Sequence, residues 1–574
     1  MVMLCAMNQG AVLVHETRTM NLSASSEVPE RNRVELLIAL AVFASACLYL
    51  WPLRDFLSFN ADEGITLVYA QRILRGQVPY RDFFTFVTPG SPYLMALWFK
   101  LFGASLIVAR SILLAYSGIF GAITYLLTRR NYDRTTALFT AAILILGCLP
   151  YRLLVNHNWD STLSALLTIY CAQRLLETSI RFWWFSVSFA AALTFILEQS
   201  KGAGVLLGLA LAAVVLSVSP KNRLQASVSK FCWAVAGFAI PMVILFAYFA
   251  SQHAIGAMLE AWIWPVRHYS MVNRLTFGTV PISAHDLHDM FTRGPLFQRT
   301  LIAFFSAPMF LIPVFTLLIL ASTTYLVVLR YKTVPSTTFD TPVLGGCVFF
   351  GVFLSTLATC RADMHHLLYL TPLFMYLMPS VFDIKHKSVR FLYRTRPIIA
   401  CLLLFSFTSF GLITVFRASA PSTQTETRRG KTRYGYPDEV IRYVQDNVTE
   451  GQHLYVHPYQ PLYSFLTGTT NPTRFDFLQP GMATTDQYES AIHDLAADQT
   501  KVVLLDPNFA ADKIPVFWPA TPLKSIASDP VTDYILQHYR TCSFLNSNPP
   551  QVWSFYYMVR KGMDCPTSAR KMTK

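Results

Sequence analysis

The sequence predicts a polytopic α-helical membrane protein with about eleven transmembrane helices and a C-terminal α/β domain outside the membrane. Of its 574 residues, 53% are hydrophobic and only 14% are charged, whereas a soluble domain carries about 25% charged residues. The apolar residues form long runs, and each run approaches the roughly 20 residues that a membrane-spanning helix needs. The net charge of +14 does not indicate a nucleic-acid partner, because Lys and Arg occur in short clusters between the apolar runs.

Polar residues 1–33 precede the first apolar run and contain no apolar core ahead of a cleavage site. We expect them to form a disordered cytoplasmic tail, followed by an uncleaved first span. The transmembrane domain then covers residues 34–416. Its predicted spans are 34–53, 105–128, 135–151, 160–176, 182–199, 203–218, 231–250, 300–329, 344–360, 367–382 and 396–416.

Basic clusters follow the second, fourth, sixth, eighth and tenth predicted spans, so all of them lie on one side of the membrane. Arg129, Arg130 and Arg134, which follow the second span, form one such cluster. The positive-inside rule assigns that side to the cytoplasm. We therefore expect the polar chemistry on the outer face of the cytoplasmic (inner) membrane. The stretches on that face are 54–104, 152–159, 251–298 and everything after residue 417.

Residues 418–574 alternate short helical and strand patterns, as is typical of a small α/β domain. Helices are expected at YPDEVIRYVQDNV and TDQYESAIHDLAAD, and strands at HLYVHP, KVVLLD and VWSFYYMVR. Cys542 and Cys565 fall in this polar region. They could form a disulfide if the domain is extracytoplasmic, and the sequence leaves paired and free thiols equally open.

The stretch FNADEGITLVYAQRILRG, residues 59–76, places the adjacent carboxylates of Asp62 and Glu63 just beyond the first span. One interpretation is structural: Asn60 caps a helix, Glu63 completes a capping box, and Gly76 ends the helix. The other interpretation is chemical. A carboxylate that is partly desolvated at the membrane face gains the basicity needed to take a proton from a hydroxyl.

The following segment, GQVPYRDFFTFVTPGSPYLMALWF, is rich in proline and aromatic residues. It cannot form one continuous helix, so we expect it to lie along the membrane interface, with Tyr80 among its anchors. Arg81 is a candidate ligand for a phosphate. Asp82 beside it supports the alternative of a local salt bridge.

An Asp-Glu-Gly that opens a helix, the pattern Gly-x-x-Pro-Tyr-x-Asp-Phe and the proline-rich lead into an apolar helix resemble the GT-C glycosyltransferases. Over the layout of residues 34–416, the chain most resembles the branch with an RgtA/B/C/D-like or dolichyl-phosphate-mannose-transferase-like domain. Protein O-mannosyltransferases and lipid A aminoarabinose transferases are relatives of that branch. The resemblance implies an inverting glycosyltransferase that moves a sugar from a polyprenyl-phosphate carrier to a hydroxyl of a lipid, glycan or protein acceptor. It also implies that Asp62, with Glu63 beside it, is the catalytic base or the acceptor-positioning group.

The resemblance is incomplete in the first outer loop. The aminoarabinose branch carries a Lys-Pro-Pro run, whereas this chain has Thr88 to Pro92 without a lysine. That difference argues against the aminoarabinose branch and leaves phosphate binding to other cations. Lys201 in LEQSKGAG is one candidate, because relatives show a Lys-Gly at this turn, and Gln199 stands near it. The structural alternative is a lysine paired with Glu198.

The stretch CRADMHHLLY, residues 360–369, resembles the Arg-x-Asp-x-x-His of many bacterial members. The resemblance implies that Arg361 binds the carrier phosphate and that Asp363 fixes the orientation of Arg361. His366 could donate a hydrogen bond to the leaving phosphate or bind a metal. The alternative is a local Arg–Asp bridge that tightens a short loop.

The expected partners are a polyprenyl-phosphate-linked sugar donor, a hydroxyl acceptor and membrane lipids. No metal-ligand spacing and no nucleotide-binding motif stands out, so no cofactor is expected and a divalent metal is not required. Residues 462–481 resemble a segment of some relatives, which suggests that the α/β domain helps to form the acceptor side. Trp264 and Tyr269 belong either to an aromatic belt or to a surface that stacks on a sugar. The rival functions are a polysaccharide polymerase or ligase, a transporter or flippase of lipid-linked sugars, and a sensor.

Overall fold

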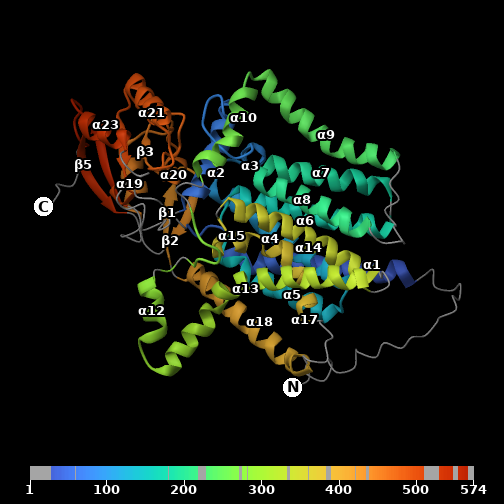
Figure 1. The fold of residues 1–574 in the computed structure, drawn as a ribbon. Coiled ribbons are helices and arrows are strands. Elements are labelled where there is room, and N and C mark those ends of the chain that lie inside the picture. Colours follow the sequence, from blue (N-terminus) through green and yellow to red (C-terminus); the bar gives the residue numbers. More distant parts are fainter. Residues whose placement is uncertain are drawn as a thin grey trace, which may run out of the picture.

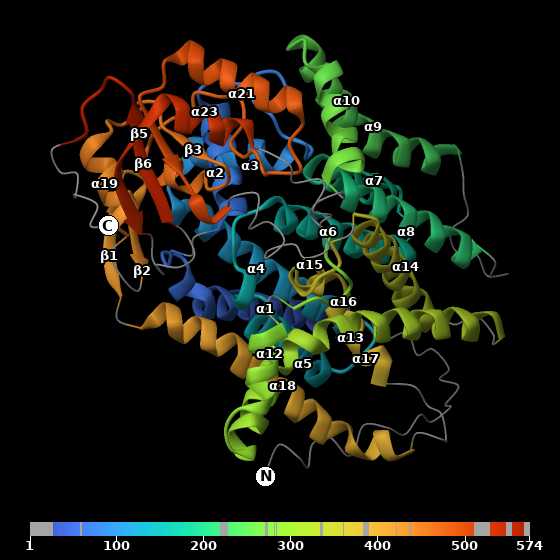
Figure 2. The same cartoon turned by 60° about the vertical axis from the view of Figure 1, so that its left-hand side comes forward.

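The structure, a computed structural model, shows a bundle of long helices with a smaller α/β region (residues 423–566) at one end (Figure 1). The helices of the bundle run roughly side by side, and the strands of the α/β region lie beyond one set of their ends (Figure 2). The structure describes residues 27–57, 60–178, 180–217, 228–269, 274–280, 282, 284–332, 337–359, 361–382, 390–420, 422–434, 438–509, 529–546 and 554–566.

The helical membrane fold expected from the sequence is confirmed. Eight of the described helices are long and apolar enough to cross a membrane, and two shorter apolar helices accompany them. The first of the shorter ones, α7, is 17 residues long. The helices of the bundle are α1 (Glu27–Leu50), α4 (Leu106–Arg129), α5 (Arg134–Ile143), α6 (His157–Thr178), α7 (Arg181–Leu197), α8 (Gln199–Ser217), α9 (Val228–Ser251), α13 (Leu296–Lys332), α14 (Thr337–Ala358) and α18 (Arg390–Ser419). Helix α5 counts among the eight together with the turns that continue it to Arg152, and α6 is not one of the eight.

Helix α1 begins at Glu27, so the last residues of the predicted disordered tail are helical instead. Pro29 falls in the first turn, where a missing amide costs no hydrogen bond, and the helix can therefore start ahead of the apolar run. The rest of the predicted tail, residues 1–26, lies outside the described residues.

The tenth predicted span, residues 367–382, is broken into short pieces. Pro372 and Pro379 lack the amide that a continuous helix needs at those positions, and most of the segment stays buried. The break leaves the residues around His366 on a separate short helix. The pieces are α15 (Met364–Tyr369), α16 (Thr371–Phe374), η6 (Met375–Leu377) and α17 (Met378–Phe382).

Several short elements gather at the end of the bundle that faces the α/β region (Figure 1). Helix α2 (Ala61–Leu74) follows the first span and is followed by Gly76, whose φ of 86° suits glycine. The proline-rich segment then runs without regular structure until α3 (Gly90–Phe102). The remaining short elements are α10 (Ile255–Trp264), η5 (Pro265–Tyr269) and α12 (Ala284–Thr292).

The α/β region contains a four-stranded mixed sheet in the order β3-β4-β6-β5. Strands β3 (Tyr455–His457) and β4 (Val502–Leu505) are parallel, whereas β6 (Ser554–Arg560) is antiparallel to both β4 and β5 (Tyr539–Asn546). The three strands expected from the sequence are present, and β5 was not predicted. The other elements are the hairpin β1 (Thr423–Thr427) and β2 (Gly430–Tyr434), and helices α19 (Glu439–Asn447), α20 (Leu462–Thr467), α21 (Thr485–Asp498) and α23 (Pro530–His538).

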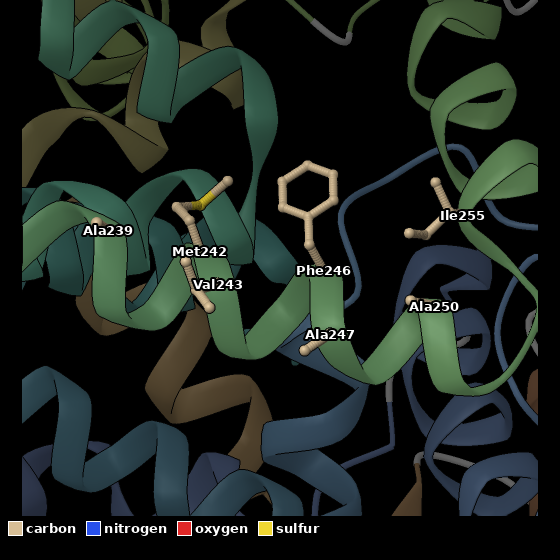
Figure 3. Close-up of a pocket in the computed structure, with 7 residues that line it drawn as sticks. All are labelled: Ala239, Met242, Val243, Phe246, Ala247, Ala250 and Ile255. Carbon is tan, nitrogen blue, oxygen red and sulfur yellow. The ribbon is translucent and has the colours of Figure 1, made fainter.

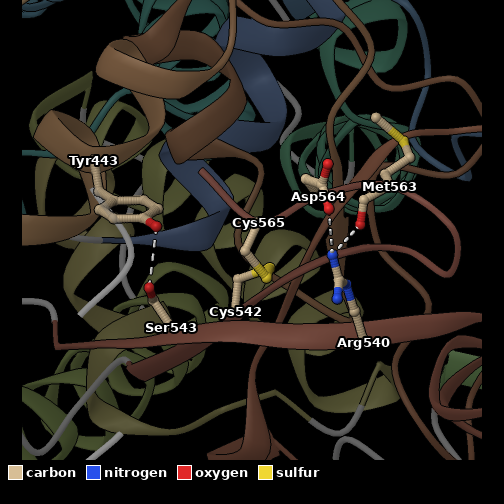
Figure 4. Close-up of a disulfide and its surroundings, with 7 residues drawn as sticks. All are labelled: Tyr443, Arg540, Cys542, Ser543, Met563, Asp564 and Cys565. Carbon is tan, nitrogen blue, oxygen red and sulfur yellow. Dashed lines mark hydrogen bonds and ion pairs between the residues drawn. A yellow bond between two sulfur atoms is a disulfide. The ribbon is translucent and has the colours of Figure 1, made fainter. Parts of the chain in front are cut away.

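A disulfide joins Cys542 of β5 to Cys565, which follows β6 (Figure 4). Beside it, Arg540 donates to the carbonyl of Met563 and lies 3.6 Å from the carboxylate of Asp564. The sequence left the state of these two cysteines open, and the structure pairs them.

The α/β region is fixed to the helical bundle by two ion pairs. Arg433 of β2 binds Asp55 with nitrogen–oxygen distances of 2.8 and 2.6 Å. Arg72 of α2 binds Asp476 at 2.8 Å, and both side chains are buried. Because each buried charge has an oppositely charged partner, these contacts set the position of the region relative to α2.

Candidate active site

The two adjacent carboxylates at the start of α2 lie in different surroundings. Asn60 caps the helix, and its Oδ1 accepts hydrogen bonds from the backbone N–H groups of Asp62 (3.0 Å) and Glu63 (3.3 Å). The Glu63 side chain is fully buried, whereas 44% of the Asp62 side chain is exposed. Neighbouring helical residues point about 100° apart, so one carboxylate turns into the bundle and the other stays accessible.

Glu63 is held by Arg110 of α4. The Arg110 Nε donates to Oε1 at 2.8 Å and Nη2 donates to Oε2 at 2.6 Å, while the N–H of Val155 also donates to Oε1 (3.2 Å). Arg110 further donates to the carbonyl groups of Leu53 (3.1 Å) and Phe56. With both oxygens engaged, Glu63 does not reach back to form the expected capping box. We therefore propose a structural role for Glu63 in place of the expected catalytic one.

Asp62 faces groups from several distant parts of the chain. The hydroxyl of Tyr459, in the α/β region, donates to Oδ1 at 2.7 Å. The Nη2 of Arg152 lies 3.8 Å from Oδ2. Arg361 and His157 are also close enough to act on the carboxylate electrostatically. An anion that faces two guanidinium groups at the edge of a membrane domain is unusual unless those charges have a function.

The pKa of Asp62 lies below its ordinary value of 3.8. Burial raises this pKa, but the positive charges of Arg152 and Arg361 and the hydrogen bond from Tyr459 outweigh that effect. Burial matters here although 44% of the side chain is exposed. The two observations agree if protein surrounds the carboxylate on most sides and leaves it open on one. Asp62 is therefore an anion at neutral pH and can accept a hydrogen bond from a hydroxyl.

Arg152 ends the short turn η4 (Pro150–Arg152) and lies just after the third predicted span. Its Nε donates to the hydroxyl of Tyr369 (3.1 Å), and that hydroxyl also accepts from Asn156 Nδ2 (2.6 Å). These bonds hold the guanidinium beside Asp62. Arg152 was not among the predicted site residues, although an arginine at an outer turn departs from the positive-inside pattern and was the available signal.

Arg361, Asp363 and His366 lie together at the start of α15. The Arg361 guanidinium lies over the ring of Tyr269, 5.9 Å from its centroid. Asp363 caps α15 by accepting from the N–H of His365 (3.0 Å), and it binds Nδ1 of His366 at 2.6 Å. Burial raises the pKa of Asp363, but His366 and Arg361 hold it well below its usual value. The expected phosphate-binding roles of Arg361 and His366 stay predictions.

Lys201, at the start of α8, is surrounded by protein oxygens. Its Nζ contacts the carbonyl of Asn158 (3.0 Å), the hydroxyls of Ser161 (2.8 Å) and Thr162 (3.1 Å), and Oε2 of Glu198 (3.0 Å). Only 3% of the lysine side chain is exposed. An ammonium group has three donors, so these four oxygens saturate it. We propose a structural role for Lys201, which ties α6 to the turn between α7 and α8, in place of the expected phosphate binding.

Arg81 lies apart from this cluster, on the exposed surface. Its Nε and Nη2 donate to Asp82 at 2.9 and 2.8 Å, and its Nη1 donates to the side chain of Gln252 at 3.3 Å. The Arg81 side chain is 41% exposed. Asp82 also accepts from the N–H of Val78 (2.7 Å), so it holds the turn. The local salt bridge, the alternative in the sequence, is the arrangement that forms.

Tyr80 and Gln199 shape the proline-rich segment. Tyr80 has a φ of 70°, is buried, and donates its hydroxyl to the carbonyl of Val87 (2.7 Å). Gln199 donates from Nε2 to the carbonyl of Phe86 (2.7 Å) and accepts from the N–H of Thr88 (3.0 Å). These two hydrogen bonds from Gln199 to the backbone of the proline-rich segment hold the segment against the start of α8. Both residues therefore fix the shape of this segment, and their supporting role at the site stays a prediction.

An aromatic cluster lies beside Asp62 and joins the bundle to the α/β region. Phe86 stacks on Trp264 with ring centroids 5.3 Å apart, and Phe477 of the α/β region meets Phe86 edge-on at 5.9 Å. Tyr459 belongs to this cluster as well as to the surroundings of Asp62. Aromatic faces of this kind stack on the apolar faces of sugars. The full cluster is Ile65, Phe84, Phe86, Trp264, Tyr269, Tyr459, Phe477 and Met482.

A hollow of about 500 Å³ lies along α9 and reaches the start of α10 (Figure 3). Its lining side chains are all apolar, so hydrocarbon is the chemistry that it suits. Helix α10 leads from this hollow to Trp264, and Tyr269, a few residues further on, lies under the guanidinium of Arg361. The lining residues are Ala239, Met242, Val243, Phe246, Ala247, Ala250 and Ile255.

Comparison with known proteins gives a family match and several solved structures. Residues 87–249 match the family model of dolichyl-phosphate-mannose-protein mannosyltransferase. ArnT from Cupriavidus metallidurans bound to undecaprenyl phosphate has 12% identity and a TM-score of 0.45, with 94% of this chain and 100% of that chain covered. The Archaeoglobus fulgidus oligosaccharyltransferase has 12% identity and a TM-score of 0.45, with coverages of 91% and 72%. AglB from the same organism, in complex with an inhibitory peptide and a dolichol-phosphate, has 13% identity and a TM-score of 0.41, with coverages of 92% and 75%.

No curated protein matches the chain by sequence. The structural scores are too low to transfer any residue's role, and none is transferred. The family match contains the second half of the proline-rich segment, from Val87 on, and Arg152, and it ends in α9. Over residues 87–249, the chain is similar to the dolichyl-phosphate-mannose-protein mannosyltransferases, and the resemblance to GT-C glycosyltransferases is confirmed.

Proposed function

We propose that the protein is an inverting glycosyltransferase, which moves a sugar from a polyprenyl-phosphate carrier to a hydroxyl acceptor on the outer face of the cytoplasmic membrane. The observation that carries the proposal is the cluster of Asp62, Arg152 and Arg361, in which a partly exposed carboxylate faces two guanidinium groups. A base for the acceptor and cations for the carrier phosphate are the two requirements of such a transfer.

The proposed reaction is a direct displacement at C1 of the sugar. The acceptor hydroxyl donates a hydrogen bond to Asp62, and its oxygen forms the new bond to C1 as the bond from C1 to the phosphate oxygen breaks. The proton passes to the Asp62 carboxylate, and the electron pair leaves with the polyprenyl phosphate. Arg152 and Arg361 stabilise the negative charge that develops on that phosphate. None of these steps requires a metal ion.

Occupation of the two arginines by the donor would also prepare Asp62 for its role. In the free protein, Arg152 and Arg361 lower the pKa of Asp62, which makes the carboxylate a weak base. A phosphate between the arginines neutralises part of that positive charge, so the pKa of Asp62 rises when the donor is bound. The base is therefore strengthened when a carrier phosphate occupies the site.

The outer-face assignment rests on the basic residues at the other end of the bundle. Glu35, Arg129 and Arg134 meet there, at the C-terminal end of α4. At the other end of α4, its cap Ser105 lies next to Gly430 of the α/β region. The positive-inside rule then assigns the α/β region and Asp62 to the outside. The disulfide between Cys542 and Cys565 fits an oxidising compartment. The apolar hollow on α9 is a suitable surface for the isoprenoid tail of the donor.

A panel of radiolabelled polyprenyl-phosphate hexoses and pentoses, offered with extracted envelope lipids and glycans to the purified protein in nanodiscs, tests the proposal. We expect transfer from one donor, reduced by at least about 100-fold in Asp62→Asn and unchanged in Arg81→Gln. Addition of EDTA tests whether a metal takes part. Undiminished transfer by Asp62→Asn, or no transfer from any donor, would overturn the proposal. Transfer to a growing glycan chain would identify a polymerase or ligase that uses the same site.

A further inference from the structure

Tyr459 is the residue through which the α/β region contacts Asp62. It follows β3 and precedes α20, and its hydroxyl donates to Asp62 Oδ1 at 2.7 Å. Its ring meets Phe477 edge-on, with centroids 6.1 Å apart. Burial and the nearby negative charge of Asp62 raise the pKa of Tyr459 well above its usual value, so the hydroxyl keeps its proton and remains a donor.

The backbone around Tyr459 is fixed against α2. A Cβ added at Gly64 would lie 2.3 Å from the backbone nitrogen of Leu462, so α2 and α20 touch at the level of their main chains. The carbonyl of Pro458 accepts from the N–H of Leu478 (2.9 Å), which holds the loop from the other side. Tyr459 therefore has a defined position relative to the N-terminus of α2.

The attachment of the α/β region does not depend on the Tyr459 hydroxyl. The ion pairs Arg72–Asp476 and Asp55–Arg433 lie elsewhere in the interface. Loss of the hydroxyl alone should leave the region docked, because these pairs and the α2–α20 contact are untouched. The Tyr459–Asp62 hydrogen bond can thus be removed without removing the interface.

We propose that Tyr459 is a positioning residue for Asp62, so that the α/β region supplies part of the machinery for the transfer itself as well as a surface for the acceptor. The inference rests on the proposed function. A carboxylate whose Oδ1 is held by a hydroxyl cannot rotate freely, and its Oδ2 is then directed toward the acceptor and Arg152. A hydrogen bond between a hydroxyl and a carboxylate at this distance is of the strong, charge-assisted kind.

The pH dependence of kcat/KM distinguishes a positioning role of Tyr459 from a merely structural one, because only a positioning role shifts this profile. The charged and titratable groups that face Asp62 are Arg152, Arg361, His157, Tyr269, Tyr369 and Tyr459. Among them, Tyr459 donates directly to the carboxylate and favours its charged form. Its removal raises the pKa of Asp62, so the acid limb of the kcat/KM profile moves to higher pH.

Tyr459→Phe tests the inference, because it keeps the ring contact with Phe477 and deletes the hydroxyl. Tyr443→Phe is the matched control, since it deletes a hydroxyl that bonds Ser543 (3.0 Å) within the same region. For Tyr459→Phe we expect a fall in kcat of about 10- to 100-fold, a donor KM within about twofold of the unmodified protein, and the shifted acid limb. We expect unmodified kinetics for Tyr443→Phe, and unfolding temperatures close to that of the unmodified protein for both variants.

The outcomes separate this inference from the function that it rests on. If Asp62→Asn abolishes transfer while Tyr459→Phe has unmodified kcat and an unmoved acid limb, the positioning role is wrong and the proposed function stands. If Tyr459→Phe loses activity only together with a lowered unfolding temperature, its role is structural and the inference is also wrong. If the unmodified protein transfers no sugar, both proposals fail.

Discussion

The carboxylate of Asp62 and the guanidinium of Arg152 lie 3.8 Å apart, too far for a hydrogen bond and close enough for a strong electrostatic attraction. Arg152 is held in that position by Tyr369, which is itself bonded by Asn156. The guanidinium therefore keeps donor groups that Asp62 does not occupy. A phosphate oxygen is the natural partner for such a preorganised arginine.

Arg152→Gln should weaken binding of the donor. Loss of a preorganised charge next to the phosphate is expected to raise the Kd for polyprenyl phosphate by about 10- to 100-fold. Arg81→Gln is the matched control, because Arg81 is exposed and solvent screens its salt bridge to Asp82. Competition against a fluorescent polyprenyl phosphate in nanodiscs measures the Kd of both variants. A larger effect at Arg81 than at Arg152 would contradict the assignment of the phosphate site.

Glu63→Gln should destabilise the protein, whereas Asp62→Asn should not. Removing the Glu63 charge leaves the buried Arg110 guanidinium without its counter-ion, at a cost of about 3–5 kcal/mol. Asp62 is partly exposed, and Asp62→Asn keeps an oxygen that can accept the hydrogen bond from Tyr459, so we expect a smaller change, of about 1 kcal/mol. Thermal unfolding in detergent distinguishes the two adjacent positions. Equal losses of stability in the two variants would contradict a structural role for Glu63 that Asp62 does not share.

Lys201→Met should lower stability without changing donor affinity in the folded protein. The substitution leaves the Glu198 carboxylate without its ion-pair partner, which costs about 3–5 kcal/mol. The double variant Lys201→Met with Glu198→Gln removes both charges and should recover part of the loss. Unfolding temperature and the Kd for polyprenyl phosphate are measured together. A raised Kd with an unchanged unfolding temperature would restore Lys201 as a phosphate ligand.

Asp506→Asn should stabilise the α/β region at high pH. Asp506 follows β4 and is buried, and burial raises its pKa to about 7 even though the N–H of Asn508 bonds the carboxylate. The folded state therefore favours the protonated form. Ionisation costs stability as the pH rises from the ordinary pKa of 3.8 through about 7. We expect the variant to gain about 2–4 kcal/mol relative to the unmodified protein at pH 8 and less at pH 5. A gain that is constant with pH would contradict the buried, protonated carboxyl.

Reduction of the Cys542–Cys565 disulfide should destabilise the α/β region. The bond closes a loop with a sequence separation of 23 residues, and a loop of this length contributes about 3 kcal/mol. Unfolding of the full chain with and without reductant measures the loss. The double variant Cys542→Ser with Cys565→Ser is the control, because its unfolding should not respond to reductant.

The sequence predicted part of the candidate site and missed Arg152 and Tyr459. Asp62, Arg361 and His366 were predicted, and the structure brings them to one end of the bundle. Arg81 and Lys201 were predicted on equal grounds, yet each is engaged by protein groups of its own. A cation next to a membrane interface looks the same in sequence whether it faces a ligand or a neighbouring carboxylate.

Tyr459 carried no signal in the sequence, because nothing in the residues around it indicates a contact with the start of α2. The contact depends on the packing of α20 against Gly64 and on the ion pairs that dock the α/β region. Such long-range contacts follow from the shape of the assembled core, which local patterns do not encode.

The sequence by itself determined most of the membrane spans, the α/β region and the helix that Asn60 caps, because hydrophobic periodicity and capping chemistry act over a few neighbouring residues. Tertiary structure alone decided that Asp62 is accessible while Glu63 is buried, and that Arg152 and Tyr459 are its neighbours. The physical reason is that the pairing of charges depends on distances through space, and those distances are set only when distant helices pack.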